Sequence, residues 1–110
     1  MAKFFARVEL HKKAQKNVTE EDYRILHEEI AKKSFYPRVE YDNDSNIYHL
    51  LTGSYRKVAP QSIKDAHRDI VEACNETIKK SSEIESFSFF LTEYTNSSKH
   101  NLKTVAIRRN

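Results

Sequence analysis

The chain opens with a segment in which apolar and polar residues alternate one by one. Strict alternation places successive side chains on opposite faces of a strand, so this segment is predicted to be a half-buried strand. One face consists of apolar side chains: Phe4, Ala6, Val8 and Leu10. The other face carries, after Phe5, three charged or titratable side chains: Arg7, Glu9 and His11. This second face is either the solvated side of a sheet or the floor of a site.

Two later segments have the apolar spacing of amphipathic helices. The first begins near Thr19, where Asp22 three residues later completes a capping arrangement, and it is about 14 residues long. The second begins at Pro60 or at Ser62, and both starts give the same buried face. The apolar stripe of the first helix consists of Tyr23, Leu26 and Ile30, and that of the second consists of Ile63, Ala66, Ile70, Ala73, Cys74 and Thr77.

The remaining apolar segments are predicted to be strands. Residues 35–41 and 47–51 alternate around the turn-forming sequence DNDSN, which predicts a hairpin. Pro37 lacks a backbone donor, so the first strand of this hairpin belongs at a sheet edge. Gly53 ends the second strand, and a loop is expected from there to Pro60. A further strand covers residues 86–91, and residues 102–107 form a possible short extra strand.

This order of elements predicts an α+β fold of the ferredoxin-like βαββαβ type. Two right-handed crossovers place both helices on one face of an antiparallel sheet, whose strands lie in the spatial order fourth, first, third, second. Residues 102–107 supply a possible short fifth strand. The first strand is central, and its charged face points away from the helices. We expect residues 1–110 to form a single domain with a basic C-terminal tail from about residue 96.

Charge is distributed unevenly along a chain whose net charge is +3. Residues 96–110 and 11–17 contain lysines and arginines but no acidic residue, so the rest of the chain is acidic overall. Basic patches on such a body favour a polyanion, most often a nucleic acid, although solvated surface residues would give the same pattern. The cations and the aromatic side chains beside them that are candidates for RNA contact are Lys12, Lys13, Lys16, Tyr36, Tyr55, Arg56, Lys103, Arg108 and Arg109.

Several classes of protein are disfavoured by the composition. The single cysteine, Cys74, allows neither an internal disulfide nor a cysteine-based metal cluster, and the five histidines lack the close spacing of a zinc site. We therefore expect no metal and no other cofactor. No segment has the apolar core of a secretory signal or the length of a membrane span, so we expect a cytoplasmic protein without membrane contact.

Four segments carry a resemblance to a known family: FFARVELH, TEEDYRILHEEI, FYPRVEYD and IYHLLTGSY. Together they resemble the GhoS-type antitoxins of type V toxin–antitoxin systems, over about the first 75 residues. The resemblance implies a ferredoxin-like fold and a small endoribonuclease that cuts a toxin messenger RNA. An RNA substrate agrees with the charge distribution, which favours a nucleic acid as the partner.

The charged face of the first strand is the candidate catalytic site for this activity. Arg7 would neutralise the scissile phosphate, Glu9 would orient or accept a proton, and His11 would move the proton between the attacking and leaving oxygens. Arg38 is expected to add a second cation from the hairpin. Such a set needs no metal. The alternative is structural, with Glu9 paired to Arg7, to Arg38 or to a lysine across the sheet.

The sequence therefore allows two functions. The first is an RNA-binding antitoxin with endoribonuclease activity. The second is a non-enzymatic ferredoxin-like homodimeric interaction or accessory protein of a phage or mobile element. Phe5 and Phe90 are expected on the sheet face away from the helices, which predicts a homodimer that covers part of that face.

Overall fold

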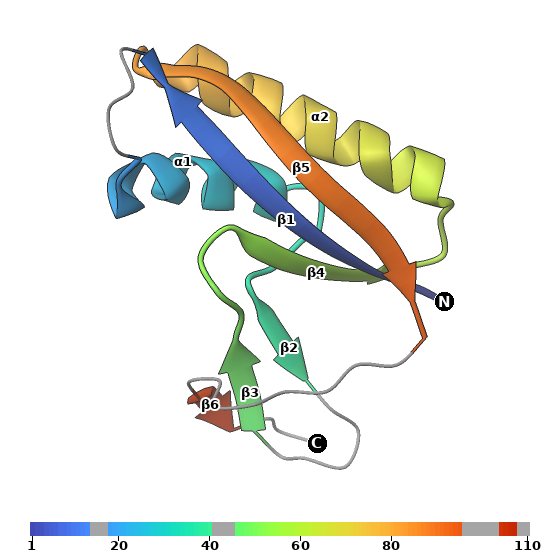
Figure 1. The fold of residues 1–110 in the computed structure, drawn as a ribbon. Coiled ribbons are helices and arrows are strands. Elements are labelled where there is room, and N and C mark those ends of the chain that lie inside the picture. Colours follow the sequence, from blue (N-terminus) through green and yellow to red (C-terminus); the bar gives the residue numbers. More distant parts are fainter. Residues whose placement is uncertain (14–17, 41–45, 96–103, 108–110) are drawn as a thin grey trace.

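Figure 1 shows the computed structural model, which describes residues 1–13, 18–40, 46–95 and 104–107. Within these residues the chain forms two helices and six strands. In chain order they are β1 (Ala2–Lys12), α1 (Glu20–Ala31), β2 (Arg38–Glu40), β3 (Asn46–His49), β4 (Ser54–Ala59), α2 (Ile63–Lys80), β5 (Ile84–Tyr94) and β6 (Thr104–Ile107). Neither helix in the described residues combines the length and the apolar content that crossing a membrane requires.

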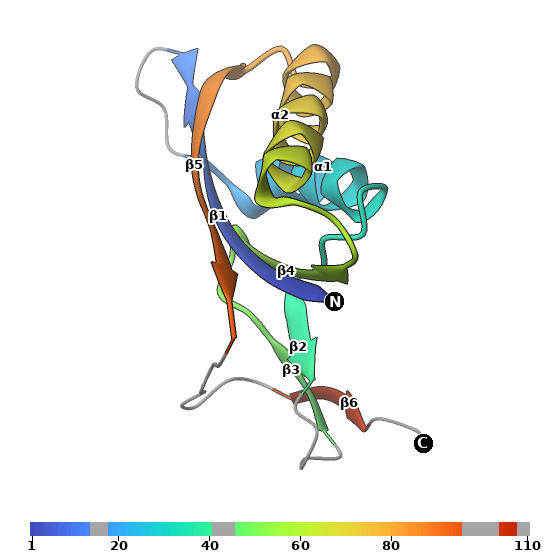
Figure 2. The ribbon, with the colours of Figure 1, turned by 90° about the vertical axis from the view of Figure 1, so that its right-hand side faces the viewer.

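The main sheet has the antiparallel strand order β4-β1-β5, with β1 at its centre. Both helices cover the same face of this sheet, as the view in Figure 2 shows. The expected α+β, ferredoxin-like arrangement is thereby confirmed. The predicted central position of the first strand is confirmed as well, so the alternation along β1 divides its side chains between a helix-covered face and an uncovered face.

The strand that pairs with β1 on the hairpin side differs from the expected one. Residues 54–59, expected to be a loop, form β4, whereas β2 and β3 pair with each other and with β6 in a second sheet of order β2-β3-β6. β1 pairs with one side of β4. On the other side, among the described residues, only Tyr36 pairs with β4, through an isolated bridge with Arg56. Residues 104–107 do form the extra strand, but they extend the second sheet.

The prediction missed β4 because a lysine occupies one of its helix-facing positions. Lys57 is only 8% exposed, and its ammonium group forms an ion pair with Asp69 of α2 at 3.1 Å. The same ammonium group lies 5.3 Å from the centre of the Phe35 ring. These partners offset the cost of burying the charge. A charged residue on the buried face hides the alternation that identifies a strand.

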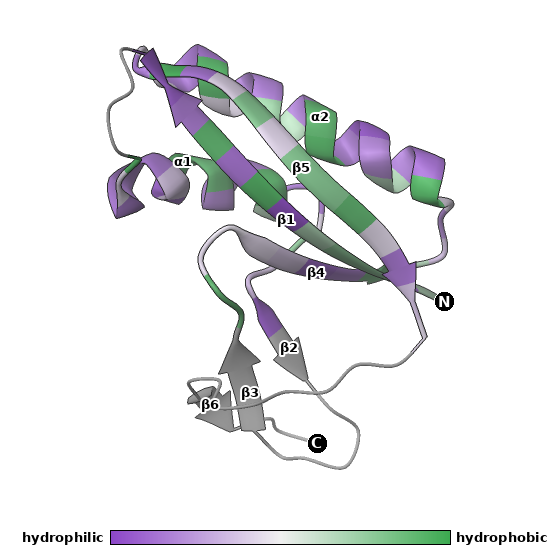
Figure 3. Ribbon diagram, in the orientation of Figure 1, coloured by the Kyte–Doolittle hydropathy of each residue, from purple (hydrophilic) through white to green (hydrophobic). Residues whose placement is uncertain are grey.

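The core lies between β1 and the two helices. Phe4, Ala6, Val8 and Leu10 are all buried there, as the alternation predicts, and Figure 3 shows the alternating hydropathy along β1. Leu26 and Ile30 of α1 and most of the predicted stripe of α2 pack against them. Burying each large aliphatic or aromatic side chain contributes about 1.5 to 3 kcal/mol. Ile63 is an exception, because it is 45% exposed at the start of α2.

The predicted start of the first helix is confirmed, and of the two starts predicted for the second helix, Ser62 is the one observed and Pro60 is not. The carboxylate of Asp22 accepts hydrogen bonds from the backbone N–H and the hydroxyl of Thr19, at 2.7 and 2.9 Å. At the start of α2, the hydroxyl of Ser62 accepts a hydrogen bond from the backbone N–H of Asp65 at 3.1 Å. These caps fix where each helix begins and therefore which residues face the sheet.

Gly53 sets the turn that leads into β4, and its replacement by alanine is expected to destabilise the protein. Its φ of 84° is unfavourable for other residues, and an added Cβ would lie 2.7 Å from the carbonyl oxygen of Val8. We expect Gly53→Ala to lower the free energy of unfolding by about 2 to 4 kcal/mol, measured by urea denaturation. Ser34 is the matched control, because its φ is also positive at 63°. Ser34→Gly relieves that strain, so it should not destabilise the protein. Equal stability of Gly53→Ala and the native chain would contradict this description of the turn.

Candidate functional site

We use the name open face for the side of the β4-β1-β5 sheet that points away from the helices. Its members are the residues of β1 that alternate with the core, together with their cross-strand partners. Arg7, for example, lies between Ser54 of β4 and Phe90 of β5. The open face consists of Lys3, Phe5, Arg7, Glu9 and His11 of β1, Ser54, Arg56 and Val58 of β4, and Ser86, Ser88, Phe90, Thr92 and Tyr94 of β5.

The predicted catalytic residues of β1 lie in a row on the open face. Arg7, Glu9 and His11 are all exposed, and neighbouring members are about 7 Å apart because strands rise about 3.4 Å per residue. Ser88 stands directly across from Glu9, and its hydroxyl oxygen is 3.0 Å from Nε2 of His11. This hydrogen bond orients the imidazole ring. A hollow of about 210 Å³ beside the row is lined by Arg7, Glu9, Ser88, Phe89 and Phe90.

The structural alternative for Glu9 required an ion pair across the sheet. In the described part of the chain, neither Glu9 nor Arg7 forms an ion pair or a side-chain hydrogen bond. Both side chains are exposed and available to a ligand. The arrangement therefore offers a cation, a carboxylate and an imidazole on one strand, which are groups suited to phosphate binding and proton transfer.

Arg38 is placed differently from the three residues on β1. It begins β2, in the second sheet, and its guanidinium carbon lies 5.6 Å from the centre of the Tyr36 ring. Among the described residues, no hydrogen bond or ion pair joins Arg38 to Arg7, Glu9 or His11. Arg38 is therefore an exposed cation stacked on an exposed tyrosine, outside the row.

Tyr36 and Arg56 lie side by side, at the edge of the main sheet. Their backbones exchange two hydrogen bonds, at 2.9 and 2.8 Å, and the Tyr36 side chain is 40% exposed. The Nε of Arg56 donates a hydrogen bond to the hydroxyl of Tyr94 across the sheet, at 2.5 Å. This contact holds the guanidinium group over the open face while leaving its other donors for a ligand.

Two of the residues predicted to contact RNA cannot do so in this structure. Tyr55 is fully buried, because its position in β4 faces the helices, so the prediction of a stacking ring there is wrong. The side chain of Lys12 is only 7% exposed and forms ion pairs with Asp22 at 2.9 Å and Glu83 at 3.2 Å. These contacts, that with Asp22 foremost, raise the pKa of Lys12. Its charge is therefore already neutralised within the fold.

The other predicted cations have no such partners or fall outside the described residues. Lys13 is exposed immediately after β1, and its backbone N–H donates a hydrogen bond to the carbonyl of Glu83 at 3.1 Å. Four predicted RNA contacts lie outside the described residues: Lys16, Lys103, Arg108 and Arg109. Ser88 could not be identified from the sequence alone, because its contact with His11 depends on the pairing of β5 with β1.

The described cations of the helix layer and those of the open face of the sheet differ in whether they form ion pairs. Most described cations of the helices and their ends form ion pairs with nearby carboxylates: Arg24, Lys32, Lys33, Arg68, Lys79 and Lys80. Helix α1 itself contains five acidic residues and one arginine. The open face instead carries Lys3, Arg7 and Arg56, which form no ion pair with described residues, against the single carboxylate of Glu9. Among the described residues, unpaired cations therefore outnumber carboxylates on the open face, which favours a positive potential there.

Comparisons with models of protein families, with curated proteins and with solved structures found no match for this chain. The described residues also contain no group of three or more histidine, cysteine, aspartate or glutamate side chains placed to hold a metal ion. The function is therefore inferred from the residues of the open face.

His27 gives the fold a predicted dependence on pH. Its ring meets Tyr55 edge-on with 5.4 Å between centroids, and its Nε2 is buried without a hydrogen-bond partner among the described residues. Burial lowers the pKa of His27 below its ordinary value. The unfolded chain therefore binds this proton more readily than the folded chain does. The stability contributed by neutral His27 is fully present above the unfolded pKa of about 6.5 and is lost as the pH falls.

Between pH 7.5 and 5.5, we expect the free energy of unfolding of His27→Leu to fall less than that of the native chain. The measurement is urea denaturation at several pH values. His67→Gln is the matched control, because it removes an exposed histidine from the other helix. If the free energy of unfolding fell equally with pH in the His27 variant and in the native chain, the His27 ring would not cause the pH dependence.

Proposed function

We propose that the open face binds single-stranded RNA and that Arg7, Glu9 and His11 cleave the bound strand. The proposal rests on Lys3, Arg7 and Arg56 of this face, which form no ion pair with described residues, whereas most described cations of the helices are paired. Exposed Phe90 and Tyr36 add aromatic rings beside these cations. A sheet that presents aromatic and basic side chains is a recurring platform for single-stranded RNA, because bases stack on rings while cations contact phosphates.

The cleavage step uses the 2′-hydroxyl of the RNA as its nucleophile. Glu9 or His11, acting as a base, removes the proton from this hydroxyl, and the oxygen attacks the adjacent phosphorus. Arg7 stabilises the negative charge that develops on the phosphate oxygens. As the bond to the 5′-oxygen breaks, protonated His11 donates a proton to the leaving oxygen. The products are a 2′,3′-cyclic phosphate and a 5′-hydroxyl end.

This activity is the one that the resemblance to GhoS-type antitoxins implies, and we propose a messenger RNA as the substrate class. The direct test is to incubate the purified protein with a labelled RNA, with and without a chelator. We expect equal cleavage in both conditions, with cyclic phosphate ends. An oligonucleotide of the same sequence with 2′-deoxyribose should bind but stay intact. Absence of RNA binding would refute the proposal, and binding without cleavage would refute its catalytic part.

Self-association is the second role that we propose for the chain. Phe90 is 65% exposed, which is unusual for a large aromatic side chain in the middle of a strand. A homodimer would give this ring a partner. A chain that dimerises but binds no RNA would be the non-enzymatic interaction protein that the sequence also allows.

A further inference from the structure

Among the residues that the structure describes, no strand pairs with the outer edge of β5. In the described residues the main sheet ends at β5, and this edge strand is 11 residues long. A long edge strand presents a row of unpaired backbone donors and acceptors, which favours pairing with another strand. Its sequence, IESFSFFLTEY, is apolar in its middle and acidic only near its ends.

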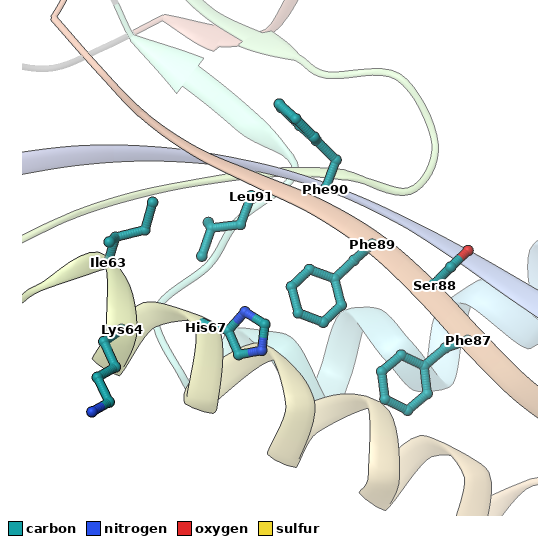
Figure 4. A pocket seen from close by; sticks show the side chains of 8 residues that line it. All are labelled: Ile63, Lys64, His67, Phe87, Ser88, Phe89, Phe90 and Leu91. Carbon is teal, nitrogen blue, oxygen red and sulfur yellow. The ribbon is translucent and has the colours of Figure 1, made fainter.

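A groove runs along this edge, between β5 and the start of α2. Its volume is about 660 Å³, and Figure 4 shows Phe87, Phe89 and Leu91 pointing into it toward α2. The ring of His67 packs on Phe89 with 4.9 Å between centroids, and Ile63 stands 45% exposed on the helix side. Phe90 points the opposite way, onto the open face. The edge is therefore flanked by exposed apolar groups on both sides of the sheet.

We propose that β5 pairs antiparallel with β5 of a second copy of this chain, with Phe90 at the two-fold axis. In this register Phe90 faces the partner's Phe90, Phe89 faces the partner's Leu91, and Ser88 faces the partner's Thr92. From residue 88 to residue 92, apolar residues therefore oppose apolar ones and polar residues oppose polar ones, while Phe87 faces the partner's Glu93. The inference rests on the self-association proposed above and is independent of RNA binding.

Charge and register favour this arrangement over its alternatives. If the two-fold axis lay at Phe89 instead of Phe90, Glu85 would face the partner's Glu93. Like charges directly opposite each other are destabilising. A dimer that stacks one open face on another would bring Lys3, Arg7 and Arg56 against the same cations of the partner subunit. Pairing at the β5 edge avoids both repulsions.

The edge-paired dimer has a consequence for the open face. Because residues on the same side of the two strands face each other, the two three-stranded sheets join into one sheet of six strands. Both helix layers lie on one side of this sheet. The two open faces then form one continuous surface that stays uncovered, so a longer strand of RNA can contact both copies.

The test uses two matched substitutions at opposite edges of the open face. Phe90 in β5 and Val58 in β4 are 65% and 41% exposed, so a lysine at either position is compatible with folding. Sedimentation velocity at rising concentration should show a dimer for the native chain. We expect Phe90→Lys to weaken the dimer at least tenfold and Val58→Lys to leave it unchanged. Ile63→Lys, on the wall of the groove, should act like Phe90→Lys.

Three outcomes would overturn the inference. A native chain that stays monomeric at high micromolar concentration would refute self-association itself. Loss of the dimer in both the Phe90 and Val58 variants would indicate stacking of the open faces. Loss in neither would place the interface elsewhere. In the last two cases self-association stands and only the β5 edge is refuted.

A cysteine cross-link tests the register. Residues directly opposite each other on neighbouring strands have Cβ atoms close enough for a disulfide, and the native Cys74 is buried away from the edge. We expect Phe90→Cys to form a covalent dimer on mild oxidation and Ser88→Cys alone to remain uncross-linked. Cross-linking of Ser88→Cys and not of Phe90→Cys would refute the proposed register.

Discussion

Replacing His11 by alanine is expected to lower the rate of RNA cleavage by about 100-fold or more, the usual contribution of a general acid or base. Glu9→Gln should have an effect of similar size, because it removes the charge and the proton acceptor while preserving the shape. Both side chains are exposed. Their substitution should therefore leave the free energy of unfolding nearly unchanged. The measurement is the single-turnover rate on a labelled RNA at saturating protein concentration.

Matched controls separate this effect from a general change of surface. His67→Ala and Glu93→Gln remove an exposed histidine and an exposed carboxylate that lie outside the row on β1. Both should cleave RNA at the native rate. Ser88→Ala tests the positioning contact with His11, and its effect should appear in the cleavage rate and not in RNA affinity. If the His11 and Glu9 variants cleaved RNA at the native rate, β1 would not be part of the active site.

The second large effect concerns affinity for RNA. Arg7→Gln and Arg56→Gln should each weaken binding by about tenfold or more, because hydrogen bonds to charged groups contribute about 1.5 to 3 kcal/mol. Each lost phosphate contact should also reduce the slope of log affinity against log salt by about 0.7. The measurement is fluorescence anisotropy with a labelled, uncleavable 2′-deoxy strand at several salt concentrations.

Arg68→Gln is the control for this experiment. Arg68 is an exposed arginine of α2 that forms an ion pair with Asp65, so its charge is already neutralised. Its substitution should change neither the affinity nor the salt dependence. If the Arg68 variant weakened binding as much as the Arg7 variant did, RNA would contact the whole basic surface without preference for the open face.

Local patterns in the sequence were sufficient to predict much of the fold. The alternation from Phe4 to His11 identified β1 and its two faces. The pair Thr19–Asp22 identified the start of α1, and Ser62 was one of the two starts expected for α2. Each of these signals lies within a few residues, where strand and helix periodicity act directly. The row Arg7, Glu9 and His11 followed from the same alternation, since residues two apart on a strand share a face.

The missed features depend on contacts between distant residues. Lys57 is buried in β4 because Asp69 of α2 neutralises it, and Lys12 is withdrawn from solvent by Asp22 and Glu83. The sequence alone cannot show such pairs before the strand register is known. The same holds for Ser88, whose contact with His11 exists only because β5 pairs with β1 in this register.

We propose that the open face of the β4-β1-β5 sheet is the RNA-binding surface. The most direct test is to record amide chemical shifts of the full chain while an uncleavable 2′-deoxy oligonucleotide is added. We expect the largest shifts on β1, β5 and β4, at Arg7, His11, Phe90 and Arg56, with the outer surface of α1 unchanged. Chemical-shift changes concentrated on α1 or α2, with none on the open face, would contradict RNA binding at the open face.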